Sequence, residues 1–235
     1  MPKRVDPPAT GERYDWPALV DELNRLLRLK TTPIGMKLFE RAADMQTIPK
    51  LRRPGAIHTT DQIVAQAARL GFTVGITRAD LVGDQCGAVI GLAPQDEEWR
   101  SGKRMAGVWF ATVADSSAHQ RAMDIVPHGR YEAMAVSPLA SARLDPPDIC
   151  LLYATPGQMI VLINGLQWSG YKKFDWSVVG ESACATIWSV VWMAVGLRIF
   201  GTTCMSSTRS NSFMPIGVVF RRSSRFSSST SAGQS

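Results

Sequence analysis

The chain has 235 residues, of which 45% are hydrophobic and 20% charged, with 19 glycines and 14 prolines. This composition is typical of a globular protein long enough for one domain or two small ones. It excludes collagen, a coiled coil, low-complexity disorder and a disulfide-rich scaffold as descriptions of the whole chain.

The net charge of +6 is concentrated near the C-terminal end. No Asp or Glu follows Glu181, and five arginines lie beyond Leu197, which leaves 21 basic against 20 acidic residues in the first 197. Because this body is nearly neutral and has no basic stripe, we expect no nucleic-acid partner.

The four cysteines are far apart, without a Cys-x-x-Cys pair, and there are three histidines. This spacing predicts no metal site, and the usage predicts reduced thiols in a cytoplasm. Residues 1–14 contain no apolar signal segment and are expected to be a disordered lead-in.

The first half of the chain alternates helical and extended patterns. Asp15 as a cap and leucines at helical spacing predict a helix over 16–29. Alternating side chains predict a strand over 34–39, and 43–56 is expected to be a loop. A second helix capped by Thr59 or Thr60 ends at Gly71, and a strand over 72–77 follows.

The second half continues this pattern less regularly. Residues 83–91 are expected to be a turn leading into a short apolar element, 108–112 a strand, and 115–126 a helix stopped by Pro127. Strands follow over 131–136 and 149–154, and the second of these reads as an interior strand. Thr155 and Pro156 predict the start of another helix. We therefore predict an α+β fold, a mixed sheet with helices packed on it in a single main domain over 15–185, with a doubly wound sheet as the alternative.

The segment 186–235 is atypical. Residues 182–197 carry no charge, which predicts a buried helix or, if 182–200 is used, a short membrane tether, although a spanning helix needs roughly 20 apolar residues. From 201 onward 11 of 35 residues are serine and none is acidic, so this tail is expected to be disordered.

Six separated segments occur in the order typical of one protein family. They are 33–37 (PIGMK), 86–92 (CGAVIGL), 130–139 (RYEAMAVSPL), 147–151 (PDICL), 155–159 (TPGQM) and 180–185 (GESACA). The stretch 33–185 thereby resembles the family of domain of unknown function 169, also called ArCR. The resemblance implies a cytoplasmic bacterial or archaeal protein and no established reaction. Members usually continue with an acidic segment and a Pro-Cys, and this sequence departs from that pattern after Ala185. We therefore hypothesise a shifted reading frame over the last 50 or so residues, which translation of the other frames would test.

Cys86 and Cys184 are the candidate catalytic residues. Each follows a glycine and an acidic residue and opens an apolar element, where a helix N-terminus favours a thiolate. The two thiols could form a redox pair beside one shared cleft, hold a metal or cluster, act singly as a nucleophile, or be small buried hydrophobes.

The candidate ligand-binding residues are Lys37, Tyr153, Thr155 and Gln158. A buried strand that runs into a capped helix leaves N–H groups suited to a carboxylate or phosphate, or it is simply a helix start. Lys37 either faces solvent from an edge strand or pairs with an anion. No nucleotide-binding loop is present, and the cofactor is unknown.

The sequence therefore predicts a cytoplasmic protein that binds a small anionic organic molecule, as an enzyme or enzyme subunit with cysteine chemistry. The alternatives are a non-catalytic binding or accessory protein, and a membrane-tethered protein. A homo-oligomer is left open.

Overall fold

The structure, a computed structural model, describes residues 14–82, 85–123, 125–170, 197–201 and 216–220. Its elements are α1 (Trp16–Leu27), β1 (Ile34–Phe39), α2 (Ala42–Met45), β2 (Leu51–Arg52), α3 (Thr60–Leu70), β3 (Thr73–Thr77), η1 (Arg78–Asp80), α4 (Gln85–Val89), α5 (Glu97–Arg100), α6 (Val113–Ala122), β4 (Ala133–Pro138), η2 (Leu139–Ser141), β5 (Ile149–Ala154), α7 (Pro156–Gly170), β6 (Leu197–Gly201) and β7 (Ile216–Phe220).

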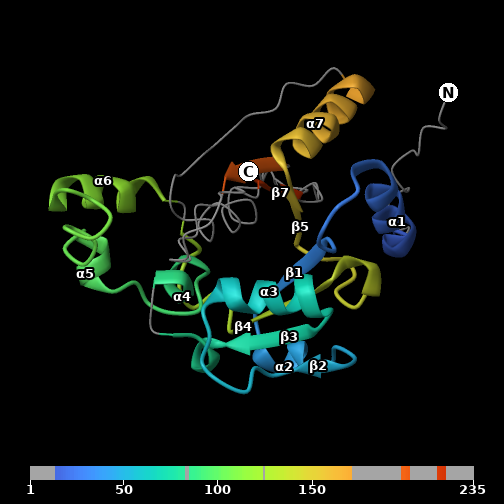
Figure 1. Cartoon of the computed structure of the whole chain (residues 1–235). Helices are drawn as coiled ribbons and strands as arrows, with labels where there is room; N and C mark the ends of the chain where they lie inside the picture. Colours follow the sequence, from blue (N-terminus) through green and yellow to red (C-terminus); the bar gives the residue numbers. More distant parts are fainter. Residues whose placement is uncertain (1–13, 83–84, 124, 171–196, 202–215, 221–235) are drawn as a thin grey trace, which may run out of the picture.

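The strands described form one mixed sheet in the order β2-β3-β4-β1-β5-β7-β6. Only β2 and β3 pair in parallel, and every other pairing among these strands is antiparallel. Helices pack around the sheet, so the predicted α+β fold with a mixed sheet is confirmed (Figure 1).

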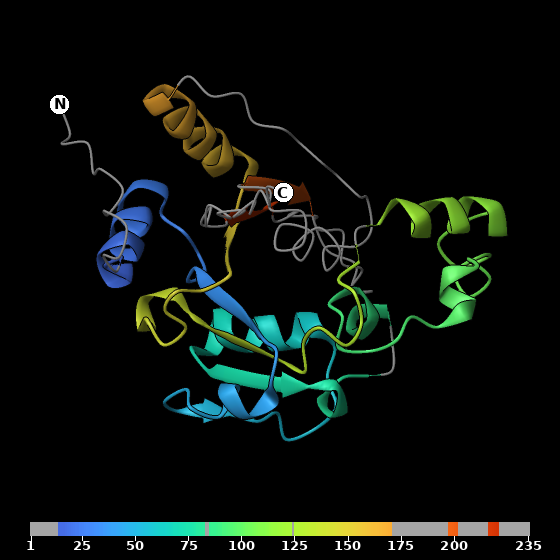
Figure 2. The same cartoon turned by 180° about the vertical axis from the view of Figure 1, so that it is seen from behind.

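Strand alternation gives the sheet two different apolar faces. One face carries Ile34, Met36 and their cross-strand neighbours, which pack under Ile63 and Val64 of α3. We call it the α3 face. The opposite face carries Gly35, Lys37 and the alternate residues of the other strands, and α2 packs on it through Met45. We call it the α2 face. Figures 1 and 2 show the two helices on opposite sides of the sheet.

Several local predictions are confirmed in detail. Asp15 caps α1 by accepting the N–H of Ala18 at 3.0 Å. Thr59 forms a capping box with Gln62 at the start of α3, and Gly71 ends that helix in a left-handed conformation (φ 71°).

Other predictions differ from the structure. The strand expected over 108–112 is wrong: in place of a strand, the N–H groups of Val108, Trp109 and Phe110 all point to the carbonyl of Met105, which makes a tight loop. β-branched and aromatic residues favour a strand only where another strand pairs with them, and no described strand pairs with 108–112. The expected loop over 43–56 contains the short elements α2 and β2.

The C-terminal segment contributes two strands. β7 pairs with β5 from Cys150–Phe220 to Ala154–Ile216, and β6 pairs with β7. The composition predicted no regular structure beyond 201, so β7 is a difference from that expectation. Residues 1–13, and 182–196 of the expected tether, lie outside the described residues, and residues 197–200 belong to β6. Within the described part of the chain, no helix has both the length and the apolar character needed to cross a membrane.

Candidate functional site

The residues predicted to bind a ligand at the start of α7 are engaged in a structural clamp. Gln158 and Thr155 cap the helix reciprocally: Oε1 of Gln158 accepts the N–H of Thr155 at 2.7 Å, and Oγ1 of Thr155 accepts the N–H of Gln158 at 3.3 Å. The Nε2 group of Gln158 donates to the carbonyls of Leu27 (2.6 Å) and Arg28 (3.0 Å), at the end of α1. Since both amide protons are used, Gln158 has no donor left for an anion.

The structure does not bring Lys37 and Tyr153 together. Tyr153 packs on the α3 face together with Leu151, two residues before it in β5. Lys37 follows Met36 of that face in β1, and because successive side chains of a strand point to opposite faces, Lys37 lies on the α2 face. Lys37 donates to the carbonyl of Pro146 at 3.0 Å. β1 lies between β4 and β5, so Lys37 is not on an edge strand as one interpretation supposed.

The structure does not test the predicted pair of thiols. Cys86 lies in the first turn of α4, but its side chain lies outside the described residues, as does all of Cys184. A shared cleft therefore stays a prediction. Cys150, in contrast, is described: it packs beside Trp16, Val20 and Leu139, and burial raises the pKa of its thiol to about 12. This thiol is protonated and unreactive at neutral pH.

The α2 face carries a small hollow that sequence reasoning missed. It has about 10 Å³ of enclosed room, enough for about one water molecule, and lies between the start of α1, the middle of β1 and the connection from β4 to β5. Its lining is mostly apolar, with two polar side chains, and consists of Trp16, Gly35, Ser137, Pro138, Leu139, Ala142, Arg143, Leu144 and Pro147.

A chain of hydrogen bonds runs away from Arg143 into the sheet. Nη1 of Arg143 lies 2.7 Å from Oγ1 of Thr73, which lies 2.7 Å from Oγ of Ser137, which lies 2.8 Å from Oγ of Ser141. Oγ of Ser141 in turn lies 2.7 Å from the carbonyl oxygen of Pro138. Thr73 and Ser137 are about 1% exposed, so these contacts are sheltered from water.

The two ends of this chain fix the direction of every hydrogen bond. A guanidinium can only donate and a carbonyl oxygen can only accept. Each hydroxyl between them must therefore accept from the side of Arg143 and donate toward Pro138. The hydroxyl proton of Ser137 is committed to Ser141, so Ser137 offers no proton to the hollow that it lines.

Arg143 is the one cationic residue among those that line the hollow. The chain of hydroxyls engages one of the five N–H groups of its guanidinium, which is always charged. The residue is half-buried, and within the described part of the molecule it forms no ion pair. Across those same residues, no cluster of His, Cys, Asp and Glu could hold a metal ion.

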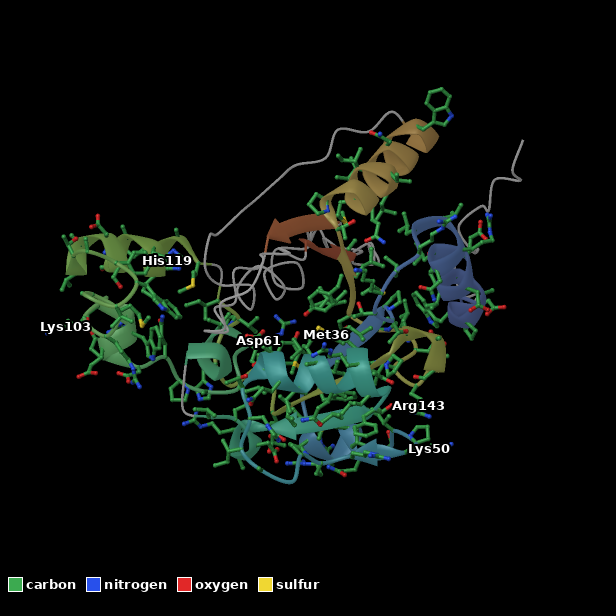
Figure 3. All side chains as sticks on the ribbon, in the orientation of Figure 1. Met36, Lys50, Asp61, Lys103, His119 and Arg143 are labelled. Carbon is green, nitrogen blue, oxygen red and sulfur yellow. The ribbon has the colours of Figure 1, made fainter. Side chains whose placement is uncertain are left out.

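Figure 3 shows where this residue lies. Arg143 and Lys50 are at the same end of the sheet, on the opposite side of the molecule from Lys103, which follows α5, and His119 of α6. The strand pairing agrees, because Leu51, next to Lys50, pairs with Thr73, which accepts from Arg143.

A model of the family DUF169, described as uncharacterised ArCR, matches residues 22–220. The chain belongs to the DUF169 family. The DUF169 match confirms the resemblance and extends past Ala185, where the sequence departs from the expected pattern, to the end of β7. No curated protein matches the chain. No solved structure matches it either.

Proposed function

We propose that this DUF169 protein binds a small organic anion, with the negative group against the guanidinium of Arg143. The observation that carries the proposal is Arg143, a permanent cation that forms no ion pair within the described residues and lines a small, mostly apolar hollow. The residue is half-buried and has no counter-charge among the described residues, so an anion beside it would supply one. The predicted ligand class is thus kept, and its site moves from the start of α7 to the hollow on the α2 face.

Binding, rather than catalysis, is the function that the described residues support. Cys150, the one cysteine whose side chain is described, packs beside Trp16 and Leu139 of the hollow and is held protonated by burial. Chemistry at Cys86 or Cys184 stays a separate hypothesis. We also propose a cytoplasmic location in bacteria, which the family resemblance implies and the free thiol of Cys150 suits.

Thermal unfolding tests the proposal with three organic anions of different class: propionate, malonate and phenyl phosphate. Each sodium salt is titrated against sodium chloride at equal ionic strength. At ten times its Kd, a ligand stabilises the native state by about 1.4 kcal/mol, which raises Tm by roughly 3–6 °C in a chain of this size.

The controls separate specific binding from salt effects. We expect Arg143→Gln to abolish the rise in Tm for every anion. Lys103→Gln removes the same charge from the far end of the molecule and should leave the rise intact. If none of the three anions raises Tm, or if Arg143→Gln retains the rise, the proposed function is wrong.

A further inference from the structure

We infer that a second copy of this chain docks on the exposed face of α7, where the two α7 helices pack antiparallel about a two-fold axis. The inference is independent of the proposed function, because no residue of α7 lines the hollow beside Arg143. Three observations carry it: the exposed apolar face of α7, the order of large and small residues on that face, and the absence of charge from the helix.

α7 has an apolar face that is open to solvent. Its inner face packs on α1 and β5 through Met159, which is almost completely buried. On the outer face Ile160 and Val161 are each more than half exposed, and Trp168 is 80% exposed. Figures 1 and 2 show α7 beside α1 at the end of the molecule away from α2 and β2. Because a helix that is apolar on all sides is normally buried on all sides, this outer face indicates a partner.

The exposed residues of the α7 outer face form one stripe along the helix, since they recur every three or four positions. They are Gly157, Ile160, Val161, Asn164, Gly165 and Trp168. Four of them, at 157, 161, 164 and 168, follow the alternating spacing of four and three residues that marks the seam of a coiled coil. The seam is therefore suited to another helix rather than to an extended peptide.

Antiparallel pairing of two copies places large residues of this seam opposite small ones. When the two-fold axis passes between Val161 and Asn164, Trp168 faces the partner's Gly157. A Cβ added to Gly157 would meet no atom within 4 Å, so the space beside it is open to an indole ring. The two Asn164 amides lie about one helical turn apart, where each can donate to the other. Parallel pairing would instead crowd two Trp168 rings together and leave a void between two glycines.

Charge and area define how strong this dimer is. No residue of α7 is charged, so two copies meet without repulsion between like charges. Each Trp168 buries roughly 150–200 Å² in the contact. The helix has 15 residues and is about 22 Å long. Two helices of this length bury less than the roughly 1,200 Å² of a standard interface, which places the dimer among weak complexes, with a Kd of about 10–100 μM.

Sedimentation equilibrium of the full chain, from about 5 to 500 μM, tests the inference by measuring the monomer–dimer Kd. Trp168→Ser should raise this Kd at least tenfold, because a large aromatic side chain dominates an interface of this size. Trp109→Ser is the matched control. Trp109 is also exposed but lies in the loop between α5 and α6, away from α7, so its replacement should leave the Kd unchanged (Figure 1).

Two further variants test the orientation and the axis. Gly157→Leu has open space in the single copy but meets the partner's Trp168 in the antiparallel pair, so it should raise the Kd at least tenfold. In a parallel pair the same leucine would fill the void and lower the Kd. Asn164→Glu and Asn164→Lys each place like charges at the axis and should be monomeric alone. An equal mixture of the two variants should restore a dimer.

A chain that stays monomeric up to 500 μM would overturn the inference, and the occupant of the α7 face would then not be a second copy. A dimer that Trp168→Ser leaves unchanged, or that Trp109→Ser weakens as much, would place the contact elsewhere and also overturn it. A lower Kd for Gly157→Leu, or no dimer in the mixture of Asn164→Glu and Asn164→Lys, would overturn the antiparallel arrangement. The proposed binding of anions beside Arg143 is unaffected by any of these results.

Discussion

Replacement of Gln158 by leucine separates a structural role for this residue from the ligand-binding role that the sequence predicted. In the structure its side chain makes three hydrogen bonds: one caps α7 through the N–H of Thr155, and two reach the last carbonyls of α1, those of Leu27 and Arg28. The substitution removes all three and keeps a side chain of similar volume.

The expected loss of stability follows from these contacts. A neutral hydrogen bond contributes about 1 kcal/mol net, and loss of a helix cap costs about the same. Because the contacts of Gln158 are half-buried rather than fully buried, we expect a loss of about 2 to 3 kcal/mol in the free energy of unfolding. With a urea m-value of about 2–3 kcal/mol per molar for a chain of this size, the midpoint of unfolding falls by roughly 1 M.

The assay is urea unfolding followed by circular dichroism, with Gln66→Leu as the matched control. Gln66 is a half-buried glutamine of α3 whose side chain makes no hydrogen bond within the described residues, so its replacement should change stability by less than about 0.5 kcal/mol. A Gln158→Leu variant as stable as the control would refute the clamp. Intact stability together with loss of propionate binding would restore Gln158 to the ligand site.

Further predictions concern burial and backbone geometry. Cys150 should resist iodoacetamide at pH 8 in the native protein and react in urea, as peptide mapping would show; rapid native alkylation would contradict its burial. The pKa of this thiol is about 12 in the folded state, and its ordinary value is 9.0. Between these pH values the unfolded state binds fewer protons than the folded state, so the free energy of unfolding should fall by about 1.4 kcal/mol per pH unit. Gly102→Ala should cost more than the about 1–3 kcal/mol of a left-handed residue, because its Cβ would lie 2.4 Å from the backbone N of Ser117. Gly107→Ala has a similar φ of 78° with open space around it, so equal melting temperatures for the two variants would disprove the clash.

The sequence predicted those parts of the fold that local chemistry decides. The bounds of β1 and β5 are as predicted, because alternation and flanking turn residues mark both strands. The caps at Asp15, Thr59 and Gly71 are also as predicted, since each acts on its own helix. The prediction of a strand over 108–112 failed because these side chains favour a strand only when another strand lies beside them.

The candidate site was harder to predict, because it depends on contacts between distant parts of the chain. Arg143 lies in a proline-rich connection with no motif around it, and Thr73, its partner, is 70 residues away in the sequence. One signal was available: Ser137 is a polar residue inside the apolar strand β4, where it requires a hydrogen-bond partner. Conversely, the helix start at Thr155 and Gln158 resembled an anion site, because a helix cap and a bound anion accept hydrogen bonds from the same N–H groups.

The pairing of β5 has a consequence for any shortened form of this chain. β1 covers only its first three residues, Ile149–Leu151, whereas β7 covers Cys150–Ala154. A protein truncated after Ala185 would lack β7 and leave the backbone of Leu152, Tyr153 and Ala154 without a partner among the described strands. Such an open, apolar margin invites pairing with the same strand of another molecule, so insolubility is the expected fate of the truncated protein.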